Sequence, residues 1–159
     1  MLSLKNLKKS LRAFTVVAVG LVAGGWALNA VLNAAALGSK THVTQVLVGW
    51  EYSGAAKLPH AYVVVRDEFG NPVNGALVTG DWSGCNRMTG ASATTQTFYK
   101  PDGTIRFDGA ALVYGKKHSC VNNNCLFTFT VTKVSMTGMT YDPASNVTSS
   151  GSTNCKPLL

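Results

Sequence analysis

The sequence predicts an all-β fold, an antiparallel sandwich of about seven or eight strands, preceded by one apolar N-terminal α-helix. Two observations lead to this fold class. Residues 13–39 pass without a formal charge, and from residue 41 the apolar residues recur in short alternating stretches separated by turn residues. The chain has 159 residues, which is about one domain. It is therefore too short for a large multidomain enzyme.

The N-terminal segment has the pattern of a chain that meets a membrane. An apolar run, residues 13–38, follows a basic stretch that contains Lys5, Lys8, Lys9 and Arg12. The positive-inside rule keeps these cations in the cytoplasm and translocates everything after residue 40. The run is long enough for a retained anchor, which we favour, and it also has the small residues of a signal peptide cleaved near Ala36 or Gly38.

Gly20 and Gly24 give the apolar run a G-x-x-x-G spacing. Small residues at this spacing let two helix backbones approach closely within lipid. The spacing therefore predicts a helix-packing face, on which the segment contacts another membrane protein or a second copy.

The strands of the sandwich follow in order after residue 40. Strong β-branched and aromatic content marks the first two, and strict alternation of apolar residues with threonine marks residues 126–134. The expected strands are 42–52, 61–67, 75–82, 93–99, 104–108, 126–134 and a short one near 136–141. We therefore divide the chain into a leader and helix (1–40), a sandwich (41–146) and a Ser/Thr-rich tail (147–159) tied by Cys155.

The alternation also assigns side chains to the core. Ala76, Val78 and Trp82 share one face of their strand, and this makes Trp82 a core residue. In the strand at 104–108, we expect Ile105 and Phe107 to point inward.

The excess of positive charge lies mainly in the leader. The formal net charge is +7 and the isoelectric point about 9.4. Five of the 14 Lys and Arg residues fall in the first forty positions, where there is no acid. The other nine lie in the rest of the chain, together with all seven acids. Because nucleic-acid binding needs cations clustered on a folded face, we expect no nucleic-acid partner.

The four cysteines all lie in the translocated part of the chain: Cys85, Cys120, Cys125 and Cys155. An even number in an oxidising compartment predicts disulfides, and four cysteines allow three connectivities. Proximity in the sequence mildly favours Cys120 with Cys125 and Cys85 with Cys155. A zinc site would need paired C-x-x-C motifs or clustered histidines, so we expect neither a metal nor a cofactor.

Motifs for catalysis are missing from the sequence. It contains no G-x-S-x-G, no H-E-x-x-H and no glycine-rich phosphate loop. The acid pairs Asp67/Glu68 and Asp102/Asp108 lie at expected turns or strand ends, where carboxylates usually face solvent. We therefore expect a non-enzymatic protein. Lys116, Lys117 and His118 form its most cationic exposed loop, which is a candidate contact surface.

Two segments resemble the bacterial immunoglobulin-like modules of secreted and cell-surface proteins. VVVRDEFGNPVNGALVTGDWSG (63–84) matches their strand, D-x-x-G-N-P-V-x-G-A turn and W-S-G strand, and FTFTVT (127–132) with TYDPASN (140–146) matches their closing strands. The resemblance implies an immunoglobulin-like sandwich that acts as a spacer, adhesion unit or appendage to a hydrolase. Many such modules carry a cysteine where this chain has Ile105, so their usual bridge does not transfer.

A second resemblance concerns the leader. KSLRAFTVV (9–17) is similar to the start of type IV prepilins, with cleavage before Phe14, but Ala18 stands where that family has a glutamate. The sequence therefore favours an exported, membrane-anchored interaction module at the cell surface or in the periplasm, contacting proteins, surface polymers or further copies of itself. The alternatives are a pilin-like filament subunit, an accessory subunit of a membrane complex and a soluble secreted module.

Overall fold

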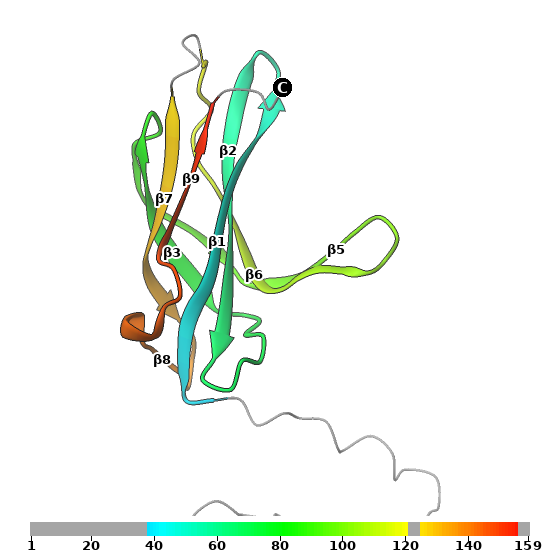
Figure 1. Ribbon diagram of the computed structural model, residues 1–159, viewed down its shortest axis with the longest axis vertical. Helices are drawn as coiled ribbons and strands as arrows, with labels where there is room; N and C mark the ends of the chain where they lie inside the picture. The colour runs from blue at the N-terminus through cyan, green and yellow to red at the C-terminus, as the bar shows by residue number, and fades with distance from the viewer. Residues whose placement is uncertain (1–37, 121–124, 156–159) are drawn as a thin grey trace, which may run out of the picture. The chain divides into compact units, whose positions relative to one another are not determined.

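The computed structural model describes residues 38–120 and 125–155 (Figure 1). These residues form two mainly antiparallel sheets, one with strand order β5-β6-β2-β1-β8 and one with order β4-β3-β7-β9. The elements are β1 (Lys40–Ser53), β2 (Ala56–Asp67), β3 (Leu77–Gly84), β4 (Met88–Thr94), β5 (Gln96–Tyr99), β6 (Ile105–Tyr114), β7 (Leu126–Ser135), β8 (Thr140–Tyr141), the 3-10 helix η2 (Pro143–Ser145) and β9 (Ser150–Asn154). The predicted all-β, two-sheet fold is confirmed. The predicted N-terminal helix lies outside the described residues.

The core lies between the two sheets, because each strand turns every second side chain inward. Trp82 of β3 is 2% exposed, and its ring centroid lies 5.0 Å from that of Phe129 on β7. The prediction that Trp82 is a core residue is confirmed. The most deeply buried apolar side chains come from both sheets and include Val43, Val63, Val65, Val78, Val113, Phe127 and Phe129.

The stretch 93–99, expected as one strand, is divided between the two sheets. Its first part belongs to β4 and its second part to β5, and Thr95 lies between them. Thr95 is buried; its hydroxyl donates to the Val73 carbonyl at 2.6 Å and accepts from the Ala76 amide at 2.9 Å. These bonds hold the chain where it crosses from one sheet to the other, so the expected continuous strand is wrong.

The strand at 104–108 does not turn Ile105 inward. Ile105 is 55% exposed, and Phe107 is half-buried with its ring 4.8 Å from that of Tyr62. β5 and the first half of β6 form a hairpin, here called the arm, which stands away from the rest of the sandwich in Figure 1. The expected inward orientation is wrong because this part of β6 pairs with β5 and leaves β2.

The C-terminal residues contribute to both sheets. β9, in the segment expected as a tail, pairs antiparallel with β7 from Leu126 opposite Asn154 onward. Val147 donates its amide to the Val43 carbonyl at 2.9 Å, and β8 pairs parallel with the first residues of β1. The chain after Asn146 is therefore part of the folded sandwich as far as Asn154.

Candidate binding site

The two disulfides join Cys85 to Cys125 and Cys120 to Cys155, with Cα–Cα distances of 5.7 and 6.1 Å. All four cysteines are paired as disulfides, as the sequence predicted, but the favoured connectivity is wrong. Strand register explains the difference, because it brings together residues that are distant in the chain. Cys85 donates its amide to Leu126 at 3.0 Å, and Cys155 donates to the carbonyl of Cys125 at 2.7 Å.

Lys116 and Lys117 are exposed beside these disulfides, as the sequence predicted for the contact loop. Asn86, which is buried, holds this loop in place. Its side-chain oxygen accepts from the Lys116 amide at 3.1 Å, and its side-chain nitrogen donates to the Lys116 carbonyl. The backbone of Lys116 is therefore fixed relative to β3 and β4, although its side chain remains free to reach a ligand.

His118 has a different role from the two lysines. Its backbone exchanges two 2.9 Å hydrogen bonds with Lys57, and its ring packs edge-on against Phe127 at 6.0 Å between centroids. It is half-buried. His118 therefore fastens the loop to β2 and the core, whereas Lys116 and Lys117 are exposed.

A hollow of about 530 Å³ opens next to this loop. Its apolar lining residues are Trp82 and Met88. The other lining residues are Ser83, Arg87, Thr89 and Lys116. We call this site the basic hollow, because its described lining residues include two cations and no acid.

The cations of the basic hollow have no carboxylate partner in the described structure. Across residues 38–120 and 125–155, the one ion pair joins Lys40 to Asp142 at 3.5 Å. Arg87 and Lys116 are therefore available to an external anion. The guanidinium of Arg87 can bind a carboxylate through two parallel hydrogen bonds, whereas Lys116 acts as a compact point charge.

The hollow also adjoins an open strand edge. Met88 and Thr89 belong to β4, which is the outermost strand of its sheet and pairs with β3 alone among the described strands. An edge strand presents unpaired backbone N–H and C=O groups to a further strand. An extended peptide that paired with β4 would therefore lie beside Arg87.

One group of potential metal ligands lies close to the loop. Ligand atoms of Cys85, His118 and Cys125 all lie within 4.8 Å of one another. The sulfur atoms of Cys85 and Cys125 are bonded to each other. Because a metal binds the deprotonated thiolate, this group could hold an ion only after reduction.

The acids considered as catalytic pairs all serve as hydrogen-bond acceptors. Asp102 caps its turn through the amide and hydroxyl of Thr104, and Asp108 accepts from Thr97 at 2.7 Å and from Asn74 at 3.0 Å. Asp67 is fully buried, so the expectation that it faces solvent is wrong.

Asp67 is the most deeply buried of these acids. Burial alone would raise the pKa of its carboxyl group, but hydrogen bonds from Gly38, Asn71 and Phe69 outweigh burial and lower the pKa to about 2. The Gly38 amide donates at 3.0 Å and the Asn71 amide at 2.8 Å. Asp67 thus joins the start of the domain to the turn after β2.

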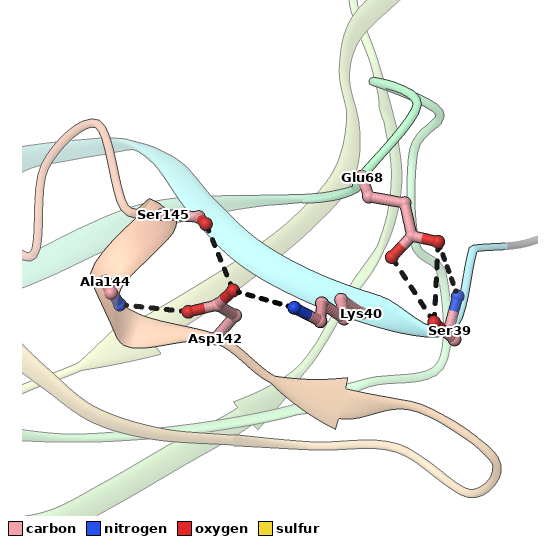
Figure 2. A network of polar contacts seen from close by, with 6 residues as sticks. All are labelled: Ser39, Lys40, Glu68, Asp142, Ala144 and Ser145. Carbon is pink, nitrogen blue, oxygen red and sulfur yellow. Dashed lines mark hydrogen bonds and ion pairs between the residues drawn. The ribbon is translucent and has the colours of Figure 1, made fainter.

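Two further acids hold the start of β1, as Figure 2 shows. Glu68 accepts from Ser39, and Asp142 pairs with Lys40 and accepts from Ser145 at 3.1 Å. The Ser145 hydroxyl bond, followed by the charge of Lys40, lowers the pKa of Asp142. This polar network surrounds a small hollow of about 160 Å³. Lys40 and Asp142 pair with each other and Glu68 accepts from Ser39, so this network fastens the start of β1.

The proposed helix-packing glycines, Gly20 and Gly24, lie outside the described residues. In the ranges 38–120 and 125–155, we find no helix with the length and apolarity needed to cross a membrane.

Sequence reasoning missed Asn86, which holds the Lys116 loop, and it missed Arg87 and Met88, which line the basic hollow. The available signal was the run C-N-R-M directly after the W-S-G segment, which places a cation two residues after a cysteine. Its use required knowledge of the long-range contact between Asn86 and the Lys116 backbone, which brings this run to the Lys116 loop. Comparison with models of protein families, with curated proteins and with solved structures finds no match for this chain.

Proposed function

We propose that this chain is an exported, non-enzymatic immunoglobulin-like interaction module that binds an extended acidic segment of a protein partner at the basic hollow. The observation that carries the proposal is the pair of cations, Arg87 and Lys116, at a hollow whose described lining includes no acid. Asn86 fixes the Lys116 backbone, so the site is organised before the partner arrives.

The open edge of β4 favours a peptide over a compact anion as the ligand. A peptide in extended conformation can pair its backbone with β4 while alternate side chains point toward the hollow. Acidic side chains at those positions would meet Arg87 and Lys116, and an apolar neighbour would contact Met88.

The disulfides support a location outside the cytoplasm. Structural disulfides persist in oxidising compartments, and both bridges lie at the end of the sandwich that carries the hollow. The basic leader and apolar run supply the export signal in this proposal. The immunoglobulin-like assignment rests on the quoted motifs together with the two-sheet fold.

Binding of a short synthetic peptide in which Glu and Val alternate tests the proposal. We expect the full chain in mild detergent to bind this peptide by fluorescence polarisation, with an affinity that falls as salt rises. Arg87→Glu and Lys116→Glu should each weaken binding about tenfold or more.

The matched control is Lys133→Glu, which makes the same charge change at an exposed position of β7. It should leave the dissociation constant within about twofold. Equal binding of a Lys-Val peptide, or equal binding by the Arg87 and Lys133 variants, would reject the basic hollow as the site.

A further inference from the structure

The outer faces of the two sheets differ in chemistry. On the sheet that contains β3, β7 and β9, the outward positions are mostly hydroxylated or charged, and the Thr128 and Ser152 hydroxyls lie 2.8 Å apart. These positions include Thr79, Asp81, Thr128, Thr130, Thr132, Ser150 and Ser152. This is the polar outer face expected of a solvated antiparallel sheet.

The outer face of the other sheet is largely apolar and aromatic. Two ladder rows cross its three central strands. Leu47, Tyr62 and Leu112 form one row, and Gly49, His60 and Tyr114 form the next. Leu47 is 40% exposed and Tyr114 is 43% exposed. We call these two rows the aromatic face; exposed apolar patches on a sheet are candidates for interaction sites.

The arm forms a wall beside the aromatic face. Tyr62 is paired with Leu112 in the sheet, yet its ring lies 4.8 Å from that of Phe107 and 5.3 Å from that of Phe98. β6 must therefore bend between Leu112 and Phe107. Gly109 has a positive φ of 63° in this stretch, and a Cβ there would lie 2.7 Å from the Val73 nitrogen.

Charge is distributed unevenly around the aromatic face. Glu51 is paired with Leu58, one row beyond His60, at the β1–β2 hairpin end. The guanidinium of Arg106 lies 5.3 Å from the Tyr62 ring centroid, at the side where the arm begins. Both side chains are exposed. The face thus has an acid at one end and a cation at the other, with the half-buried side chains of His60 and Tyr62 between them.

We infer that two copies of this chain pack together through their aromatic faces, related by a two-fold axis. A face with opposite charges at its two ends is complementary to itself, because the two-fold rotation brings Glu51 of each copy toward Arg106 of the other. The exposed apolar and aromatic side chains of the two rows then lose contact with water. This association uses the sheet that does not contain β4.

Site-specific photo-crosslinking of the full chain in a bacterial host tests this inference. A benzoylphenylalanine replaces Leu47 in one tagged copy, and a second copy carries a different tag. We expect an irradiated product that contains both tags. The matched control carries the crosslinker at Thr130, on the polar outer face of the other sheet, and should give at least fivefold less of this product.

Exchange of the two charges distinguishes the two-fold contact from other causes of the doubly tagged product. Glu51→Arg and Arg106→Glu should each reduce the doubly tagged product at least fivefold, and the two changes together in every copy should restore it within about twofold. Resistance to limited proteolysis verifies that each variant is folded. Failure of the double variant to recover, or crosslinks from Leu47 only to other molecules, would overturn the inference. Loss of peptide binding at the basic hollow would leave these results unchanged, so the two proposals fail separately.

Discussion

At the scale of single residues, Asp67 connects the start of the domain to the turn after β2. Its carboxylate accepts bonds from the amides of Gly38, Phe69 and Asn71 and from the Asn71 side chain. A buried donor that loses its acceptor retains the full cost of its desolvation. The contribution of Asp67 therefore exceeds that of an ordinary surface carboxylate.

Asp67→Ala leaves several of these donors without an acceptor. We expect the free energy of unfolding to fall by about 3 kcal/mol, measured by urea denaturation with intact disulfides. Asp102→Ala is the matched control, because Asp102 is exposed and caps one turn; its effect should be several-fold smaller. Equal effects of the two substitutions would contradict the role of Asp67.

The low pKa of Asp67 also predicts a direction of pH dependence. Its pKa of about 2 in the folded protein lies below the ordinary value of 3.8. The ionised form therefore stabilises the fold fully above the ordinary value, and this stabilisation is lost as the pH falls through the folded-state value. Asp67→Asn should differ most from the wild type at neutral pH and least near pH 2, as denaturation at several pH values will measure. A difference independent of pH would contradict this.

At the scale of elements, the disulfides add covalent links at the ends of strands that the sheet already pairs by backbone hydrogen bonds. They join the end of β3 to the start of β7, and the chain before β7 to the end of β9. Their sequence separations are 40 and 35 residues. Loops of that size correspond to about 4 kcal/mol each in the chain-entropy account of crosslinking.

Peptide mapping under non-reducing conditions should identify the pairs Cys85–Cys125 and Cys120–Cys155. We expect the double replacement Cys85→Ser/Cys125→Ser to lower the free energy of unfolding by about 4 kcal/mol, measured by urea denaturation. A fragment containing Cys120 bonded to Cys125 would show that sequence proximity, and not strand register, determines the pairing.

The sequence predicted elements well where one local pattern was sufficient. Strict alternation located β7, and it placed Val78 and Trp82 on the inward face of β3. It failed at Thr95, where the chain crosses between sheets, and at Ile105, where β6 leaves β2. Both failures depend on which strand pairs with which, and alternation within one strand contains no information on that pairing.

The candidate site was predictable only in part for the same reason. Exposure of Lys116 and Lys117 followed from their place in a charged loop. Arg87 joins them because Asn86 binds the Lys116 backbone across 30 residues of sequence. Such a long-range contact follows from the register of the folded sheets, which no local sequence pattern reveals.

At the scale of the whole molecule, the two proposed contacts use different parts of the sandwich. The basic hollow adjoins β4, and the aromatic face covers the outside of β1, β2 and β6. A pair of copies joined through the aromatic face would thus present two basic hollows. Two linked sites raise the effective affinity for a partner with repeated acidic segments.

The N-terminal boundary of the mature chain distinguishes the alternatives for the whole molecule. A retained anchor begins at Met1, a pilin-like subunit at Phe14 and a soluble module near Leu37 or Ser39. In the folded domain, the Gly38 amide donates to the buried Asp67 and Ser39 donates to Glu68. A chain beginning at Ser39 would lack the first of these bonds, so the fold favours a terminus upstream of Gly38.

Intact-mass measurement of the exported protein, before and after reduction, will locate this boundary. We expect a chain that begins at Met1, with four thiols that become reactive only after reduction, because all four cysteines are in disulfides. A start at Phe14 would instead support the filament alternative. A start at Ser39 would contradict both retention of the anchor and the role given to Gly38, because a mature domain without that residue would leave Asp67 short of a donor that it uses in the folded state.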